Sequence, residues 1–351
     1  MNRIVKIGSI ETGEKNNICD VPGVLVGHTT IIDGVNKTGV TAILPHSGNL
    51  FENKVVSGSY VFNGFGKSIG LMQLDELGTI ETPIILSNAL SASKTANSLI
   101  TYMLKDNPEI GVTTSTVNPL VLECNDGTIN QTQNRVITDE DVFNAINNAK
   151  SDFEQGAVGA GTGMRCQGFK SGIGSSSRIV KIKDKEYVLG VLVNSNFGRS
   201  NGKDLIFKGR SLGALIKDYN LEMEKDKGSI IVVIATNAPL DNRQLKRIAA
   251  RAIIGIGKTG SYGGNGSGDV FVAFSTTNNV KHYNEKVEEQ VLRISDNFID
   301  VFFDAVIDAT EESILNSLLY AKGMTSYNGK YFKSLMEYKE LFEDLLENEK
   351  L

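Results

Sequence analysis

Residues 228–236, with the sequence Gly-Ser-Ile-Ile-Val-Val-Ile-Ala-Thr, constrain the fold of this chain more than any other stretch. The five consecutive Ile and Val residues are too β-branched for a good helix and too apolar for a strand at the edge of a sheet. The stretch therefore predicts a central strand that is buried on both faces. A charged segment without periodicity, residues 222–227, directly precedes it.

The Gly228–Ser229 junction has two interpretations. An ordinary transition from loop to strand explains it, because turn residues commonly flank strands. Alternatively the bond cleaves itself, since glycine has no Cβ to obstruct the approach of the serine hydroxyl to the preceding carbonyl. An N-to-O acyl shift and hydrolysis would then leave Ser229 as a new N-terminus, with its hydroxyl beside its own α-amine. The junction alone favours the ordinary interpretation.

The composition excludes several classes of function. A formal net charge of −5 over 351 residues provides no basic field for nucleic acid, and no apolar run approaches the roughly 18 residues of a membrane span. Cys19, Cys124 and Cys166 are widely spaced, which favours neither a disulfide framework nor a zinc site. The first residues lack an apolar signal segment, so we expect a cytoplasmic protein without nucleic-acid or membrane partners.

The sequence also predicts no metal and no cofactor. His28, His46 and His282 are scattered along the chain, which supports neither a metal site nor a histidine base. Residues 255–260 match the Gly-x-Gly-x-x-Gly spacing of dinucleotide sites. That motif requires a strand before it and a helix after it, and here the predicted order is the reverse.

Hydrophobic periodicity predicts strands and helices along the whole chain, with no linker-like composition between two halves. We therefore expect one layered α/β domain. Strands are predicted at 39–44, 82–88, 120–123 and 270–275, with a hairpin over 179–193; helices are predicted at 71–77, 93–104, 138–149 and 240–256, as two helices over 287–321, and over the charged tail 331–351.

Polar residues stand next to several predicted strand ends. Ser267 and Asp269 lie two residues apart in a glycine-rich loop just before a strand, which could bring a hydroxyl and a carboxylate together at a pocket. Asn194 and Asn196 end another strand and could present amides to a developing oxyanion. A solvated loop and amides that merely cap a strand are the ordinary alternatives.

Several ordered blocks of the sequence resemble one known family. They lie at residues 20–30, 63–71, 81–84, 123–127, 159–164, 228–240 and 267–269. One block alone is weak evidence, but their order along one chain is specific. From about residue 17 to residue 323, the chain resembles the DmpA-type family of N-terminal-nucleophile serine aminopeptidases, also called L-aminopeptidase/D-esterases, which includes β-peptidyl aminopeptidases.

The resemblance implies a single αββα domain, in which two β-sheets lie between helical layers. It also implies self-cleavage between Gly228 and Ser229. The resulting pieces, 1–228 and 229–351, would stay associated, commonly in a homotetramer.

The same resemblance assigns roles to four residues. Ser229 would be the nucleophile toward a short peptide or an amino-acid amide with a free N-terminus. Ser267 and Asp269 would support it, and Asn196 would help to form the oxyanion hole. The base is either the new α-amine of Ser229 or a hydroxyl–carboxylate relay, and the sequence leaves both open.

Substrate binding is less defined, because this chain departs from part of the family. Some members have a tyrosine just before the Asp-Gly pair of one block, where this chain has Asn125. An Asn side chain can donate a hydrogen bond but lacks the reach and acidity of a phenol, so the substrate preference is not carried over. The substrate's ammonium group needs acceptors, for which Glu123 and Asp126 are candidates; either residue could instead serve the turn.

Two other functions remain open. An acyltransferase of the ornithine acetyltransferase type resembles this fold, but that family uses a threonine nucleophile and this chain has Ser229. A non-catalytic homologue could keep the sandwich as a binding module. Loss of self-cleavage would favour the binding module, since one serine serves both reactions.

Overall fold

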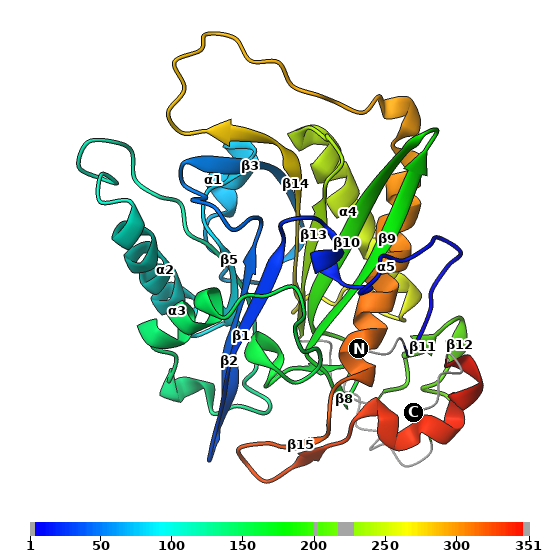
Figure 1. The fold of residues 1–351 in the computed structure, drawn as a ribbon. Helices are drawn as coiled ribbons and strands as arrows, with labels where there is room; N and C mark the ends of the chain where they lie inside the picture. The colour runs from blue at the N-terminus through cyan, green and yellow to red at the C-terminus, as the bar shows by residue number, and fades with distance from the viewer. Residues whose placement is uncertain (1–3, 200–201, 217–227, 347–351) are drawn as a thin grey trace.

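The computed structural model describes residues 4–199, 202–216 and 228–346. Two sheets pack face to face, and helices cover the outer face of each (Figure 1). This is the expected αββα sandwich. The charged segment 222–227 lies outside the described residues.

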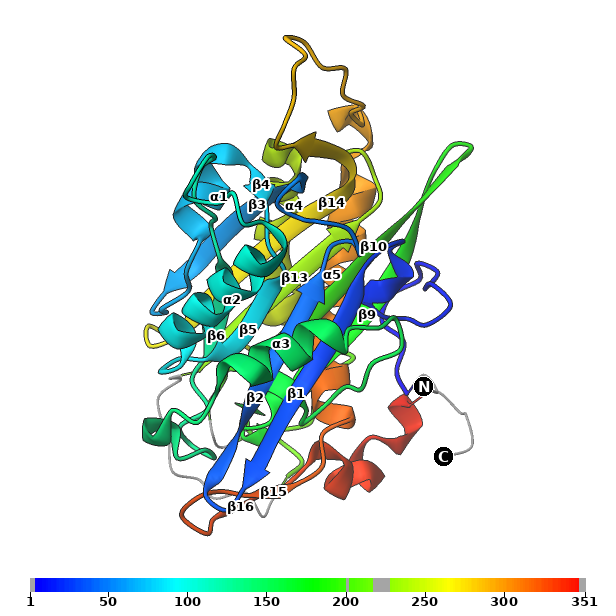
Figure 2. The ribbon, with the colours of Figure 1, turned by 60° about the vertical axis from the view of Figure 1, so that its left-hand side comes forward.

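The smaller sheet has four strands in the order β1-β2-β5-β6, of which only β5 and β6 run parallel. Helices α2 and α3 lie across its outer face (Figure 2). The elements of this half are β1 (Leu25–Asp33), β2 (Asn36–Leu44), β5 (Ile84–Asn88), β6 (Leu120–Cys124), α2 (Ala92–Asp106) and α3 (Asp139–Asn147).

The larger sheet has six strands in the order β4-β3-β14-β13-β10-β9. Helices α4 and α5 pack against its outer face, and the short helix α1 lies beside β3 (Figure 1). The elements are β4 (Thr79–Ile80), β3 (Asn53–Gly64), β14 (Gly268–Lys281), β13 (Ser229–Thr236), β10 (Lys185–Asn196), β9 (Ile173–Ile182), α1 (Leu71–Leu77), α4 (Asn242–Lys258) and α5 (Asp300–Leu319).

Strand β13 is central to this sheet, as its sequence predicts. It pairs antiparallel with β10 on one side and parallel with β14 on the other, and all of its residues are buried. Ile231 and Val233 join the core between the two sheets, whereas Ile230 and Val232 join the core beneath the outer helices. An apolar residue at every position is what a strand with two covered faces requires.

The region before α5 corrects the prediction of two helices over 287–321. Residues 282–295 are irregular, and α5 alone follows a short 3-10 turn. Val291, expected on a buried helical face, is 69% exposed. The N–H of Ile294 donates to the carbonyl of Pro239, and its carbonyl accepts from the side chain of Gln244. Neither group is therefore available for the hydrogen bonds of a helix.

The tail likewise differs from the predicted helix. Residues 331–346 form the short strand β16 (Tyr331–Phe332) and two 3-10 helices, Leu335–Leu341 and Glu343–Leu345. Phe342 is buried against the aromatic ring of Phe207. Tertiary packing therefore sets this conformation rather than the charge-rich periodicity. The last five residues of the prediction, 347–351, lie outside the described part of the chain.

A buried ion pair joins the larger sheet to α5. Arg178 of β9 and Glu312 of α5 lie 2.8 Å apart, and both side chains are fully buried. The backbone N–H of Ile7 also donates to Glu312, and the Arg178 guanidinium donates to the carbonyl of Ile7. The pair therefore ties the N-terminal segment, the sheet and the helix together.

Removing one member of this pair leaves a buried charge without its partner. We expect Arg178→Met to lower the free energy of unfolding by about 3–5 kcal/mol, and Arg178→Met combined with Glu312→Leu to restore most of the loss. Chemical denaturation of the three proteins checks this. A double variant no more stable than the single one would contradict it.

Candidate active site

Ser229 and Asn196 are direct partners where β13 begins and β10 ends. Directly opposed residues of an antiparallel pair point to the same face, with their Cβ atoms about 5 Å apart. Ile231, two residues along β13, belongs to the core between the sheets, so Ser229 and Asn196 face that interior. Both side chains are buried.

The start of β14 completes this edge of the sheet. Because β13 and β14 are parallel, their amino ends lie side by side, with Ile230 opposite Asp269. The backbone N–H of Gly268 donates to Oγ of Ser229 at 3.2 Å. The pairing therefore brings the two polar segments of the sequence, 228–229 and 267–269, to one place.

Ser267 and Asp269 form a buried hydrogen-bonded pair. Oγ of Ser267 donates to Oδ1 of Asp269 at 2.6 Å. Nδ2 of Asn63 donates to the other carboxylate oxygen at 3.1 Å. Sequence reasoning gave Asn63 no role, although it lies in one of the blocks that carry the resemblance. Within the described residues, no hydrogen bond joins Ser229 to Ser267 directly.

The side-chain amide of Asn196 is held at both ends. Its Oδ1 accepts from the backbone N–H of Arg165 at 3.2 Å, and its Nδ2 donates to the carbonyl of Asn125 at 2.9 Å. The amide therefore has a defined orientation, and one of its two N–H groups remains for another acceptor. The side chain of Asn125 is exposed, and its one described hydrogen bond is accepted from the N–H of Gly127.

The two candidate acceptors for an ammonium group differ in their contacts. Asp126 is buried, and its Oδ2 accepts from Thr38 at 2.6 Å and from Asn130 at 3.0 Å. Burial raises the pKa of Asp126 to about 6, although these hydrogen bonds oppose the shift. Asp126 thus serves the turn that follows β6.

Glu123 lies near the start of β14 and has fewer described hydrogen bonds than Asp126. Burial raises the pKa of the Glu123 carboxyl. The backbone N–H of Lys67, which donates to Oε1 at 2.7 Å, partly opposes this rise. A Cβ placed on Gly66 would lie 3.4 Å from this oxygen and 4.0 Å from Cα of Gly268, the residue bonded to Ser229. Gly66 and Gly268 therefore separate Glu123 from the edge of the larger sheet where Ser229 lies.

Position 228 accepts only glycine. A Cβ at this position would lie 1.8 Å from the carbonyl oxygen of Asn196, which no rotamer change can relieve because the contact is with backbone. The backbone before Ser229 is thereby packed against the end of β10. The sequence favours glycine here because it leaves the preceding carbonyl accessible. The contact with Asn196 adds a steric reason.

The described part of the chain provides no cluster of three His, Cys, Asp or Glu side chains suited to a metal ion. Among its helices, none combines the length and the apolar character needed to cross a bilayer. The Gly-x-Gly-x-x-Gly segment 255–260 lies at the carboxyl end of α4, as the reversed order of elements predicts.

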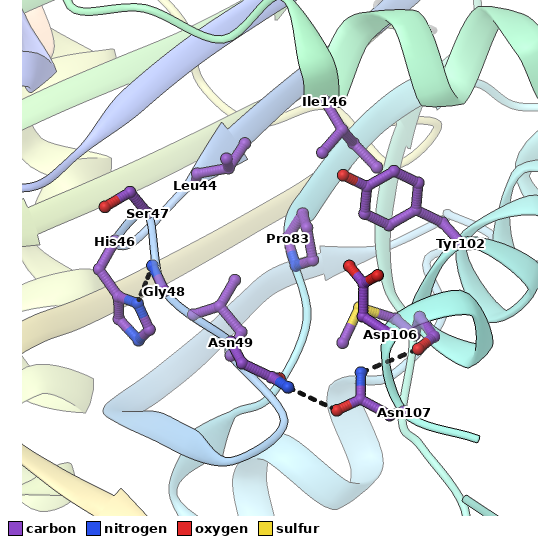
Figure 3. Close-up of a pocket in the computed structure, with 12 residues that line it drawn as sticks. Leu44, His46, Ser47, Gly48, Asn49, Pro83, Tyr102, Asp106, Asn107 and Ile146 are labelled. Atoms are coloured by element: carbon purple, nitrogen blue, oxygen red, sulfur yellow. Dashed lines mark hydrogen bonds between the residues drawn. The ribbon is translucent and has the colours of Figure 1, made fainter.

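A separate cavity of about 200 Å³ lies at the other end of the smaller sheet. Figure 3 shows Pro83, at the amino end of β5, with Tyr102 and Asp106 of α2 around it. Strands β5 and β6 are parallel, so Asn125 lies beyond their opposite end. The five residues of β5 span about 16 Å, which separates Asn125 from the cavity. The cavity contains none of the candidate site residues.

The two sheets between helical layers, with a serine opening a central strand at a polar edge, define the sandwich seen in hydrolases of the Ntn type. The chain belongs to peptidase family S58, whose model matches residues 16–332. It is therefore a hydrolase of the peptidase class, and the family resemblance seen in the sequence is confirmed.

Characterised relatives cover most of the chain. It is 36% identical over 343 residues to the β-peptidyl aminopeptidase BapA of Sphingosinicella microcystinivorans, spanning 90% of this chain and 84% of the relative. The corresponding protein of Sphingosinicella xenopeptidilytica is 35% identical over 339 residues, spanning 90% and 83%.

Solved structures match the fold closely. The PH0078 protein of Pyrococcus horikoshii OT3 has a TM-score of 0.91 with 49% identity and covers 96% of both chains. The L-aminopeptidase D-Ala-esterase/amidase of Ochrobactrum anthropi, described as a prototype of the serine aminopeptidases, has a TM-score of 0.88 with 32% identity and covers 96% of both chains. A Burkholderia β-aminopeptidase has a TM-score of 0.89 with 30% identity, spanning 99% of this chain and 98% of its own.

We expect the cavity of Figure 3 to play no part in catalysis. Asp106→Asn removes its exposed carboxylate far from Ser229, so kcat/KM for an amino-acid arylamide should stay within about twofold of the unmodified protein, as is usual for surface changes. Steady-state kinetics checks this. A tenfold loss would place the substrate in this cavity instead.

Proposed function

We propose that this chain is a self-cleaving serine aminopeptidase that removes N-terminal residues from short peptides, amides or esters. The observation that carries the proposal is the placement of the Gly228–Ser229 bond. The serine hydroxyl opens a buried strand beside the amide of Asn196 and the N–H of Gly268, and only glycine fits before it.

The first reaction would be the cleavage itself. Oγ of Ser229 attacks the carbonyl carbon of Gly228, an ester bond forms, and the bond from that carbon to the Ser229 nitrogen breaks. The hydroxyl proton passes to the departing nitrogen, which becomes an amine. Water then hydrolyses the ester, which gives pieces 1–228 and 229–351 of one domain and a free hydroxyl on Ser229.

The second reaction would use the same hydroxyl on a substrate. Oγ attacks the substrate's carbonyl, the new α-amine of Ser229 or the Ser267–Asp269 pair takes the proton, and the leaving amine receives it. The free N–H of Asn196 is suited to the developing oxyanion. Water then releases the acyl group. No step requires a histidine or a cofactor.

The substrate's ammonium group would bind Glu123. Asp126 is engaged by Thr38 and Asn130, whereas Glu123 faces the edge that bears Ser229 and makes one described hydrogen bond, with Lys67. A carboxylate at this edge would select substrates with a free N-terminus. The names of the relatives, β-peptidyl aminopeptidase and L-aminopeptidase D-Ala-esterase/amidase, support the same class of reaction.

Ser229 also separates this proposal from its rivals. An acyltransferase would pass the acyl group to an amine rather than to water, and the ornithine acetyltransferase type does so from a threonine. A binding module would leave the Gly228–Ser229 bond intact. The homotetramer and the cytoplasmic location that the sequence indicates stay predictions.

Freshly synthesised protein should resolve into two masses that divide between Gly228 and Ser229, because glycine leaves the preceding carbonyl open to attack by the Ser229 hydroxyl. Intact-mass spectrometry measures this directly. Ser229→Ala, which removes only the hydroxyl, should give one mass near the 38.0 kDa of the whole chain. A single uncleaved mass for both proteins would favour the binding module over the enzyme.

Glu123→Gln should raise KM for an amino-acid arylamide roughly 10- to 100-fold and change kcat much less, since it removes a charged hydrogen bond of about 1.5–3 kcal/mol. Burial raises the pKa of Glu123, so this carboxylate is protonated at a higher pH than an ordinary Glu. As the pH falls, KM of the unmodified enzyme should therefore start to rise at that higher pH. The pH dependence of KM checks both statements.

Asp126→Asn is the matched control for this substitution. Because Asp126 serves the turn after β6, its loss should lower the unfolding temperature and change KM by less than Glu123→Gln does. If Asp126→Asn raises KM more than Glu123→Gln, the assignment of the two carboxylates is reversed.

A further inference from the structure

Lys170 is a fully buried lysine at the end of β8 (Phe169–Lys170). Its ammonium group donates to three backbone carbonyls, those of Met164 at 2.8 Å, Gly161 at 3.2 Å and Ser171. None of its described acceptors is a carboxylate. The three N–H groups of an ammonium match the three acceptors.

A buried ammonium without a counter-ion is expensive. The penalty for removing such an ion from water is several kcal/mol, and burial accordingly lowers the pKa of Lys170 to about 7. An apolar side chain of similar length would avoid this cost but would take a donor away from each of three buried carbonyls. The three hydrogen bonds are what this buried charge provides in return, so the segments that they hold in place matter.

The bonds of Lys170 fix the turn that orients Asn196. Two of its acceptors, Gly161 and Met164, belong to the turn that leads directly into Arg165. The backbone N–H of Arg165 in turn donates to Oδ1 of Asn196. Together with the bond from Nδ2 to the Asn125 carbonyl, this contact fixes the orientation of the Asn196 amide and leaves one N–H for an oxyanion.

The other side of Lys170 is attached to the same strand end. Oγ of Ser171 donates to the carbonyl of Ser195 at 2.7 Å, and the N–H of Ser195 donates to the carbonyl of Gly172 at 3.0 Å. The ammonium therefore links two segments that contact the end of β10. The 161–165 turn contacts the side chain of Asn196, and Ser171 contacts the backbone of the neighbouring Ser195.

We propose that Lys170 is a positioning residue for the reaction: its ammonium holds the 161–165 turn, and through Arg165 it keeps the N–H of Asn196 aimed at the oxyanion formed when Ser229 attacks. The inference rests on the proposed function of Ser229 and Asn196. Without Lys170, Gly161 and Met164 of the turn each lose a donor, Arg165 is held less firmly, and the Asn196 amide keeps only its bond to the Asn125 carbonyl.

The test is a double-mutant cycle on the cleaved enzyme with an amino-acid arylamide as the probe substrate. Lys170→Met should lower kcat about 10- to 100-fold while KM stays within about twofold, the usual scale for residues that orient a functional group. Asn196→Ala should lower kcat by at least as much. The double variant should be no slower than Asn196→Ala, because Lys170 acts through that residue.

Lys54→Met is the matched control. Lys54 is another mostly buried lysine, paired with Glu81 at 2.7 Å, but it lies nine residues from Asn63 along β3, about 30 Å from the site. The same substitution there should lower the unfolding temperature and leave kcat within about twofold. A loss of kcat in Lys54→Met equal to that in Lys170→Met would reduce Lys170 to a general stabiliser.

Two results would overturn the inference. One is a kcat of Lys170→Met within twofold of the unmodified enzyme, and the other is a double variant whose loss is the product of the two single losses. Should Lys170→Met fail to fold or to self-cleave, Lys170→Arg replaces it. That variant keeps the charge and displaces the donors, so kcat should fall, and an unchanged kcat would overturn the inference.

These outcomes are separate from the failure of the proposed function. An unmodified protein that neither self-cleaves nor hydrolyses the arylamide would contradict the proposed function itself. An active unmodified protein with an equally active Lys170→Met would contradict only the role of Lys170.

Discussion

The parallel pairing of β13 with β14 is the constraint on which the rest of this structure depends. Parallel strands begin at the same edge of a sheet, and α4 provides the crossover that parallel strands require. Ser229 therefore starts beside Gly268, although 38 residues separate them in the chain. The antiparallel neighbour β10 ends at this same edge, which adds Asn196. A polar cluster results from backbone register alone.

The same sheet order explains how a cut chain would stay together. Strands β13 and β14 would belong to the second piece, and they are flanked by β10 and β3 of the first. Each would keep its ladder of hydrogen bonds across the division between the pieces. The Arg178–Glu312 pair adds a buried contact between β9 and α5, again one element from each piece. Cleavage at Gly228 would thus remove one covalent bond from an otherwise continuous sheet.

Two buried charged groups around the site, Glu123 and Lys170, are matched to backbone groups rather than to opposite charges. Glu123 accepts from a backbone N–H, and Lys170 donates only to carbonyls among the described residues. Dipoles of the main chain are fixed by the fold, so they hold these groups in one orientation without neutralising them. A carboxylate held in this way keeps its capacity for a substrate cation. An ammonium held in this way stiffens the turn that bears Arg165.

The sequence by itself determined the elements with strong local patterns. The Ile/Val run gave the buried strand β13, helical spacing gave α2, α3 and α4, and the ordered motifs identified the family and the residues that meet at the sheet edge. Tertiary structure alone decided the rest, because it depends on contacts between distant residues that no local period encodes. Asn63 reaches Asp269 across 206 positions, and Ile294 is bonded to Pro239 instead of continuing a helix. The bonding of Asp126 was likewise set by partners such as Thr38, 88 positions away.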